Sequence, residues 1–149
     1  PWDFNGYSDK PNEGKIACGY FVSTPLKHLN FNLNRFKIAQ QAAKPIIEIL
    51  TVNKEANQSY SNGNWKRLLK DIGKQSDGIY IVGLDNHVGW IEKRGDQIDF
   101  IHSSYGGNCV CVIRESADTS PIFVNSNYYL VGRLSGNKQF LSKWLEENS

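Results

Sequence analysis

The chain has 149 residues with 17 basic and 15 acidic side chains, which leaves a formal net charge of +2. This length suits one domain with a true hydrophobic core. The near balance of charge argues against a nucleic acid or an anionic membrane as a partner recognised through bulk electrostatics. No stretch approaches the roughly 20 apolar residues that cross a bilayer, so we expect no membrane span.

The first part of the chain predicts a loop followed by helices. Turn-forming residues fill 1–15 and predict an N-terminal arm. Apolar residues recur at helical spacing from Cys18 to Leu29, with Pro25 expected to kink or restart the helix. A second helix is expected over Arg35–Ala43, ending before the next proline. The apolar run Ile46–Leu50 fits a strand or a helix equally well.

The second part of the chain changes to the period of strands. A polar loop is expected over 58–64, after which Asn64 caps a helix that runs to Ile72 and stops before Gly73. Short β-branched and aromatic runs then predict five strands, Ile79–Val82, Val88–Glu92, Ile98–His102, Val110–Ile113 and Tyr128–Leu134. A helix over Ser135–Glu147 ends the chain. Helices followed by an antiparallel meander predict an α+β domain.

Cys109 and Cys111 lie two residues apart on a predicted strand. On a strand their Cα atoms are roughly 6.5 to 7 Å apart, near the upper limit for a disulfide. We therefore expect two small core residues, and whether they are free thiols stays open. A Cys-x-Cys metal site lacks further ligands nearby. The chain begins at Pro1 without Met, so we expect a mature form whose leader has been removed, which favours export.

Cys18 opens the first predicted helix, where a thiol can serve as a nucleophile. A cysteine attacks as its thiolate, and a free thiol has a pKa near 8.5, so its pKa must be lowered. A helix N-terminus contributes positive potential for this purpose. Its free amides can also stabilise a tetrahedral oxyanion. The position of Cys18 therefore predicts an activated thiolate.

Two of the three histidines are candidates for the base. His28 lies near the far end of the Cys18 helix and on a different face, which excludes it. His87 begins a strand, where Gly89 on the same face leaves room for a helix or substrate. His102 is expected on the adjacent strand, in a position to orient the His87 ring and fix its tautomer.

The segment Ala17-Cys18-Gly19-Tyr20-Phe21-Val22 resembles the Asp-Cys-Ser-Gly-Phe-Val motif of NlpC-type, papain-like cysteine peptidases. His87-Val88-Gly89 and Phe100-Ile101-His102-Ser103-Ser104 are similar to the His-Val-Gly and Phe-Ile-His-Ala-Ser segments of that family. The resemblance implies a papain-like fold with the nucleophile helix packed on an antiparallel sheet. It also implies Cys18 as nucleophile, His87 as general base and acid, and His102 as third member.

The chain departs from the family pattern at several places. Ala17 replaces the family aspartate, and the serine after the cysteine is missing. Trp2 takes the place where a family tyrosine helps to hold the oxyanion, and an indole N–H can donate the same kind of hydrogen bond. Asp85 and Ser103 are further candidate contacts to the substrate. The chain is expected to be one domain, 1–149, with a helical insertion over 30–76 that shapes one wall of the cleft.

These residues predict a cysteine hydrolase that cleaves an amide or peptide bond through a thioester acyl-enzyme, with no cofactor. The expected partner is a peptide or amide substrate, with a peptidoglycan-derived peptide as one candidate, and the expected location is extracytoplasmic, periplasmic or secreted. The alternatives are a catalytically inactive binding module and an acyltransferase of the same architecture. A zinc site formed by Cys18, His87 and His102 is also open.

Overall fold

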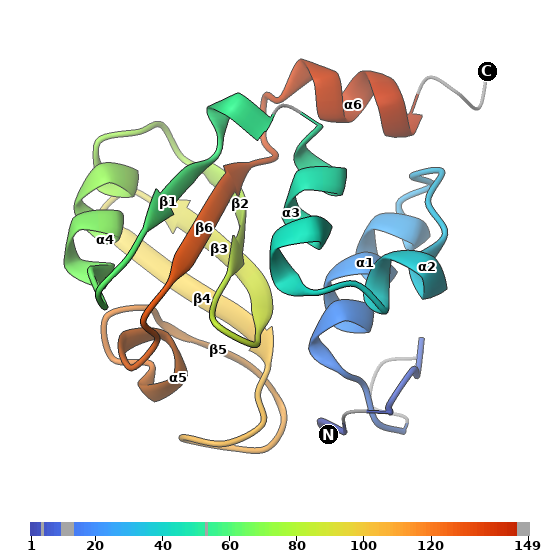
Figure 1. Ribbon diagram of the computed structural model, residues 1–149, viewed down its shortest axis with the longest axis horizontal. Coiled ribbons are helices and arrows are strands. Elements are labelled where there is room, and N and C mark those ends of the chain that lie inside the picture. The colour runs from blue at the N-terminus through green and yellow to red at the C-terminus, as the bar shows by residue number, and fades with distance from the viewer. Residues whose placement is uncertain (4, 10–13, 53, 146–149) are drawn as a thin grey trace.

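The computed structural model describes the whole chain except residues 4, 10–13, 53 and 146–149. The protein is an α+β domain in which one six-stranded antiparallel sheet has helices on both of its faces (Figure 1). No helix within the described residues is both long enough and apolar enough to cross a bilayer.

The helices come mostly from the first half of the chain and the strands mostly from the second. The helices are α1 (Cys18–His28), α2 (Arg35–Ala39), α3 (Ala43–Thr51), the 3₁₀ helix η1 (Lys54–Ala56), α4 (Trp65–Gly73), α5 (Pro121–Val124) and α6 (Lys138–Leu145). The strands are β1 (Gln58–Tyr60), β2 (Gly78–Gly83), β3 (Val88–Arg94), β4 (Gln97–Ser103), β5 (Val112–Ser116) and β6 (Tyr129–Arg133).

The strands are arranged in the order β1-β6-β2-β3-β4-β5. The four consecutive strands from β2 to β5 form the meander that their turn-separated runs predict. The expectation of a simple meander is wrong for the last strand, because β6 crosses back and pairs with β2 instead of β5. Strand β1 then pairs with the outer side of β6 and forms one edge of the sheet.

Each face of the sheet buries its own hydrophobic core because strand side chains alternate between the two faces. One core joins α1, α3 and α6 to the sheet, through buried residues that include Val22, Ile47, Ile81, Trp90, Leu130 and Phe140. The other core joins α4 and α5 to the opposite face, through Leu68, Ile72, Tyr80, Phe100, Phe123 and Tyr129. Helix α1, which begins at Cys18, therefore lies in the layer on one face of the sheet, and α4 and α5 lie in the layer on the other.

The region around the early prolines differs from its prediction. Helix α1 continues through Pro25 as one element instead of restarting there. The predicted helix Arg35–Ala43 is interrupted, because α2 ends at Ala39 and α3 begins at Ala43. Pro45 then lies in the first turn of α3, where its missing N–H removes no intrahelical bond. The ambiguous run Ile46–Leu50 is therefore helical.

Several further predictions near turns are corrected. Part of the predicted loop 58–64 forms the edge strand β1. The Asn64 side chain makes no capping hydrogen bond, and Gly73 is the last residue of α4 instead of following it. The last helix starts at Lys138, and positions 146 and 147 of its predicted range lie outside the described residues. Helix α5 has no counterpart in the prediction, although Ser120 and the following proline form a standard helix start.

The predicted strand Val110–Ile113 is displaced toward the C-terminus. Strand β5 starts at Val112, and Cys109 and Cys111 lie in the preceding loop, where they form a disulfide. Their Cα atoms are 5.4 Å apart, closer than two alternate residues of an extended strand. The expectation of two separate core thiols is therefore wrong, because the backbone turns at this point, as the bridge between Gly106 and Cys109 shows.

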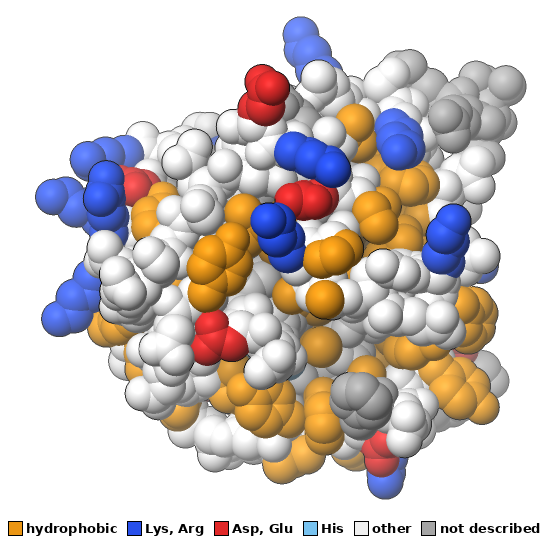
Figure 2. Space-filling view, viewed as in Figure 1, with side chains coloured by type: hydrophobic (Ala, Val, Ile, Leu, Met, Phe, Trp, Pro, Cys, Tyr) orange, Lys and Arg blue, Asp and Glu red, His pale blue; other side chains and the backbone are white. Residues whose placement is uncertain are grey.

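Charges are mixed over the surface seen in Figure 2. Basic side chains gather at the left edge of this view, over α4, whose exposed residues include Lys66, Arg67 and Lys70. Helix α1 lies on the other side of the sheet (Figure 1), so this basic patch is separate from the helix that begins at Cys18.

Candidate active site

Cys18 is the first residue of α1 and follows the N-cap residue Ala17. Its half-buried sulfur is hydrogen-bonded by the backbone N–H groups of Val88, Gly19 and Cys18 itself. Burial raises the pKa of the Cys18 thiol above its usual value, and the three N–H groups offset this only in part. The expected lowering of this pKa is therefore wrong, because the helix start is desolvated as well as electropositive.

The start of the nucleophile helix is fixed to the sheet next to the histidines. Ser103 is fully buried at the end of β4, and its hydroxyl donates a hydrogen bond of 2.6 Å to the carbonyl of Ile16. Ile16 lies two positions before Cys18, and Ser103 directly follows His102. The Ser103 hydroxyl is therefore engaged in this structural contact, and the expected contact with the substrate stays a prediction.

His87 and His102 form a buried pair on neighbouring strands. The Nε2 atom of His87 lies 2.8 Å from Nδ1 of His102, and the two residues are 2% and 0% exposed. The His102 ring stacks on Phe100 with its centroid 4.0 Å away, and His87 contacts the edge of the same pair. The sequence-based expectation that these histidines lie side by side is confirmed.

Gly89 makes this packing possible. A Cβ atom at this position would lie 2.6 Å from the Phe100 ring and 2.9 Å from Cβ of His102. Real Cβ contacts are not that short, so a side chain here would displace both rings. The space beside Gly89 is therefore filled by Phe100 and His102, not by the helix or substrate that the sequence analysis expected.

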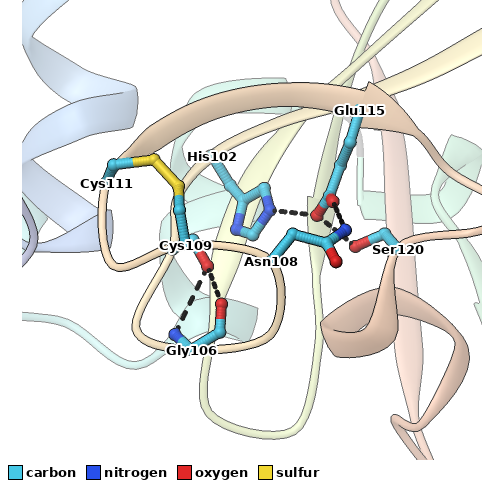
Figure 3. The surroundings of a disulfide bond; sticks show 8 residues. His102, Gly106, Asn108, Cys109, Cys111, Glu115 and Ser120 are labelled. Atoms are coloured by element: carbon cyan, nitrogen blue, oxygen red, sulfur yellow. Dashed lines mark hydrogen bonds and ion pairs between the residues drawn. A yellow bond between two sulfur atoms is a disulfide. The ribbon is translucent and has the colours of Figure 1, made fainter.

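Glu115 continues the chain of polar groups and was missed by the sequence analysis. Figure 3 shows its carboxylate facing the His102 ring from β5, with Asn108 and Ser120 on its other sides. One carboxylate oxygen lies 2.9 Å from Nε2 of His102 and 2.6 Å from the Ser120 hydroxyl. The other accepts a hydrogen bond of 2.8 Å from the Asn108 side chain. The result is a continuous chain from His87 through His102 to Glu115.

The ionisation states of His87, His102 and Glu115 follow from the surroundings of each side chain. Burial would raise the pKa of Glu115, but hydrogen bonds from Ser120, His102 and Asn108 hold it below its usual value, so the group is a carboxylate at neutral pH. Burial lowers the pKa of His102, an effect that Glu115 opposes. Burial, together with the charge that His102 can carry, lowers the pKa of His87 to about 3. Both imidazoles are therefore neutral at physiological pH.

The carboxylate also fixes the tautomers of both rings. Because Glu115 can only accept, Nε2 of His102 carries a proton and Nδ1 of His102 is left as an acceptor. His87 must then donate from its own Nε2, which leaves a lone pair on its Nδ1. This Nδ1 atom is buried and has no hydrogen-bond partner within the described residues. The site thus contains one basic atom, Nδ1 of His87, whose lone pair is fixed in direction and has no hydrogen-bond partner among the described residues.

Cys18 and His87 line the same cavity of about 620 Å³. Trp2 lines it too, and its buried indole Nε1 also has no hydrogen-bond partner in the described part of the chain. Tyr105 packs between these groups, with its ring centroid 5.9 Å from Trp2 and 5.1 Å from His87. The residues that carry the thiol, the unpartnered imidazole nitrogen and the unpartnered indole N–H therefore line one cavity.

Asp85 lies at the rim of this cavity and does not orient His87. Its carboxylate accepts backbone hydrogen bonds of 2.8 Å from Tyr128 and 3.0 Å from Asn127, and it has none with the histidine. Residues 39–46, from the end of α2 into the start of α3, contribute another part of the lining of this cavity. No group of three or more His, Cys, Asp or Glu side chains within the described residues is placed to hold a metal ion.

No family model matches the chain, and comparisons with curated proteins and with solved structures find no match either.

Proposed function

We propose that the protein is a cysteine hydrolase that cleaves an amide bond through a thioester acyl-enzyme. The observation that carries this proposal is the unpartnered Nδ1 of His87, a residue that lines the same cavity as Cys18. A buried polar atom without a partner is costly, and a catalytic role is one of the explanations for such an atom in a folded protein. Here the atom is also held in the tautomer that accepts a proton.

The proposed reaction starts from a neutral thiol and a neutral imidazole. Nδ1 of His87 takes the proton of Cys18 as the sulfur attacks the substrate carbonyl carbon. The oxyanion accepts hydrogen bonds from backbone N–H groups at the start of α1 and from the indole N–H of Trp2. His87 then gives the proton to the leaving amine, the C–N bond breaks and a thioester remains. Water attacks the thioester with His87 as base, which releases the acid and the thiol.

His102 and Glu115 support this cycle without touching the substrate. When His87 becomes an imidazolium, its Nε2–H is held by Nδ1 of His102, whose far side faces the Glu115 carboxylate. The negative charge at the end of the chain favours the charged form of His87 that the reaction requires.

The architecture that we propose for this chain is papain-like and NlpC-type. The nucleophile at the start of a helix, a histidine at the start of β3 and a second histidine near the end of β4 support it. We also propose an extracytoplasmic location, since disulfides such as Cys109–Cys111 persist in oxidising compartments.

The test uses p-nitrophenyl acetate as an acylating probe, because its good leaving group makes acylation independent of an unknown natural substrate. We expect a burst of nitrophenolate and an acetyl group on Cys18 in intact-mass spectra. Cys18→Ala should abolish both and keep its melting temperature within about 4 °C, because the change removes one half-buried sulfur. Wild-type protein that gains no acetyl group on Cys18 would contradict the proposal.

The same probe separates the two kinds of acyl transfer. If water is the acceptor, the acetyl-enzyme decays at a rate that added amines do not change. If the protein is an acyltransferase, glycinamide should accelerate the decay and appear as its N-acetyl derivative. A protein that binds but has no turnover gives neither outcome.

A further inference from the structure

A second, smaller cavity of about 270 Å³ lies beside the proposed active site. It shares four lining residues with the larger cavity, namely Asp85, Asn86, His87 and Tyr105. Cys18 lines only the larger of the two, whereas His87 lines both. The two cavities therefore adjoin at His87, and we call them the larger and the smaller arm of the proposed site.

The chemistry of the proposed function assigns a different part of the substrate to each arm. The acyl carbon must bond to Cys18, so the acyl portion lies in the larger arm. The leaving nitrogen must receive its proton from His87, so the amine portion extends past His87 into the smaller arm. Because this arm has less than half the volume of the other, it accommodates a small amine portion.

The side-chain charges on the walls of the two arms differ from those of a site that binds an anionic substrate. Among the described residues that line either arm, only Asp85 has a charged side chain, because the His87 imidazole is neutral. The larger arm is lined mainly by small, apolar and amide side chains, which include Ala39, Gln40, Gln41, Ala42, Ala43 and Ile46. An anionic group on the substrate would find a carboxylate at the junction and no lysine or arginine on these walls.

The Asp85 carboxylate is held in place before any ligand binds. The backbone N–H groups of Asn127 and Tyr128 bind one carboxylate oxygen each, and the N–H of Asp85 donates to the Ser126 hydroxyl at 3.2 Å. A carboxylate has about four acceptor positions, so two remain for a ligand. A fixed anion binds a cation without the entropic cost of ordering a free side chain.

We propose that the smaller arm is a subsite for a cationic amine portion, so that the preferred substrate is an amide of a small diamine or a similar amine with a second positive charge. This inference rests on the proposed function, because it takes the direction of the substrate from the roles of Cys18 and His87. It separates this chain from enzymes whose substrates have a carboxylate next to the scissile amide.

Three amides that differ only in the charge at the end of one chain test the subsite. They are N-acetylcadaverine, which is cationic, N-pentylacetamide, which is neutral, and N-acetyl-δ-aminovalerate, which is anionic. Binding is followed by NMR titration of ¹⁵N-labelled Cys18→Ala protein, in which no turnover occurs. We expect the cationic amide to bind about fivefold more tightly than the neutral one and the anionic amide to bind most weakly, with shifts at Asn125 and Ser126.

The matched variants are Asp85→Asn and Asp96→Asn. Both remove one negative charge, but Asp96 is exposed in the turn between β3 and β4, away from both arms. We expect Asp85→Asn to remove the preference for the cation and Asp96→Asn to keep it. Because Asp85→Asn also disturbs two backbone hydrogen bonds, a second measurement raises the ionic strength with Asp85 intact. Salt should reduce the preference for the cation and leave binding of the neutral amide unchanged.

The outcomes separate the subsite from the proposed function. Equal binding of the three amides, or a preference that persists in Asp85→Asn, overturns the subsite even if p-nitrophenyl acetate acylates Cys18. The expected order of binding without acylation of Cys18 supports the subsite as a cation site and overturns the hydrolase. Both results together support an amidase with a cationic leaving group.

Discussion

The Nδ1 atom of His102 lies 2.8 Å from the Nε2 atom of His87, and this contact makes the two imidazoles a single proton-accepting unit. When Nδ1 of His87 accepts a proton, a positive charge is added to the hydrogen-bonded row of side chains that ends at the Glu115 carboxylate. Glu115 on β5 raises the pKa of His102, and the charge that His102 can carry lowers the pKa of His87, which lies directly before β3.

The alkylation rate of Cys18 should rise with pH throughout the neutral range. The pKa of this thiol is raised by burial, so its thiolate fraction at pH 7 is smaller than that of free cysteine. We expect iodoacetamide to label one thiol per chain, since Cys109 and Cys111 are bonded to each other, and to label it more slowly than free cysteine. His87→Ala should slow the reaction further, and His28→Ala should not. Fast labelling that stays constant below pH 7 would instead indicate a resting thiolate–imidazolium pair.

The stability of the protein should fall as the pH is lowered through the range in which free histidine becomes protonated. Burial depresses the pKa of His87 from 6.5 to about 3, so the unfolded chain binds a proton that the folded chain refuses. The contribution of neutral His87 to the free energy of unfolding is therefore complete above pH 6.5 and decreases as the pH falls below that value. Melting temperatures measured between pH 6.5 and 4.5 give the slope of stability against pH. This range lies above the pH values at which protonation of carboxylates dominates the loss of stability. His87→Gln should flatten the slope and His28→Gln should retain it. Equal slopes in all three proteins would argue against a buried neutral His87.

Replacing Glu115 by Gln should reduce the rate of Cys18 acylation by about 10- to 100-fold, the usual cost of losing a group that orients a catalytic residue. Glu115 raises the pKa of His102, so its loss should also move the acid limb of the pH–rate profile to lower pH. This shift is the decisive measurement, because a purely structural defect lowers the rate equally at every pH. Glu55→Gln, at an exposed position in η1, is the matched control. An unchanged profile would remove Glu115 from the proton-accepting chain.

Opening the Cys109–Cys111 disulfide should affect activity more than stability. The bond lies in the segment between β4 and β5, in which Tyr105 packs against His87 and Asn108 is hydrogen-bonded to Glu115. Because the closed ring spans only three residues, its loss should cost about 1.5 kcal/mol of unfolding free energy. We expect a several-fold lower acylation rate in a Cys109→Ser/Cys111→Ser double variant. Tris(carboxyethyl)phosphine should slow the wild type to the same rate and leave the double variant unaffected. Equal rates in all states would show that the loop holds its position without the bond.

The elements that support the thiol and the two imidazoles were predictable because their signals are local. The helical spacing after Cys18 and the alternating strands around His87 and His102 each lie within about ten residues. Strand β1 was not predictable in this way, because Gln58–Tyr60 is polar and exists as a strand only through its pairing with β6. The position of β6 depends in the same way on pairing between segments that are distant in sequence.

Glu115 shows why the site was predicted only in part. His102 is paired with Ile113 and Phe100 with Glu115, so Glu115 lies on the same sheet face as both rings. The predicted strand ended at Ile113 and thereby excluded this residue. Alternation continued for two more positions would have placed a carboxylate next to His102. Desolvation of Cys18, in contrast, depends on the packing of α1 against the sheet and leaves no signal in the local sequence.

The hydrogen bond from Ser103 to the carbonyl of Ile16 has a consequence for how this protein can change over evolution. It connects the strand that carries His102 to the segment that leads into Cys18, independently of the wall formed by residues 39–46. Under the proposed function, substitutions in that wall would alter which acyl groups fit while this hydrogen bond still connects the Cys18 segment to the strand of His102. The proposed enzyme would then acquire new specificities by mutation of residues 39–46 alone, with the connection between the Cys18 segment and β4 kept.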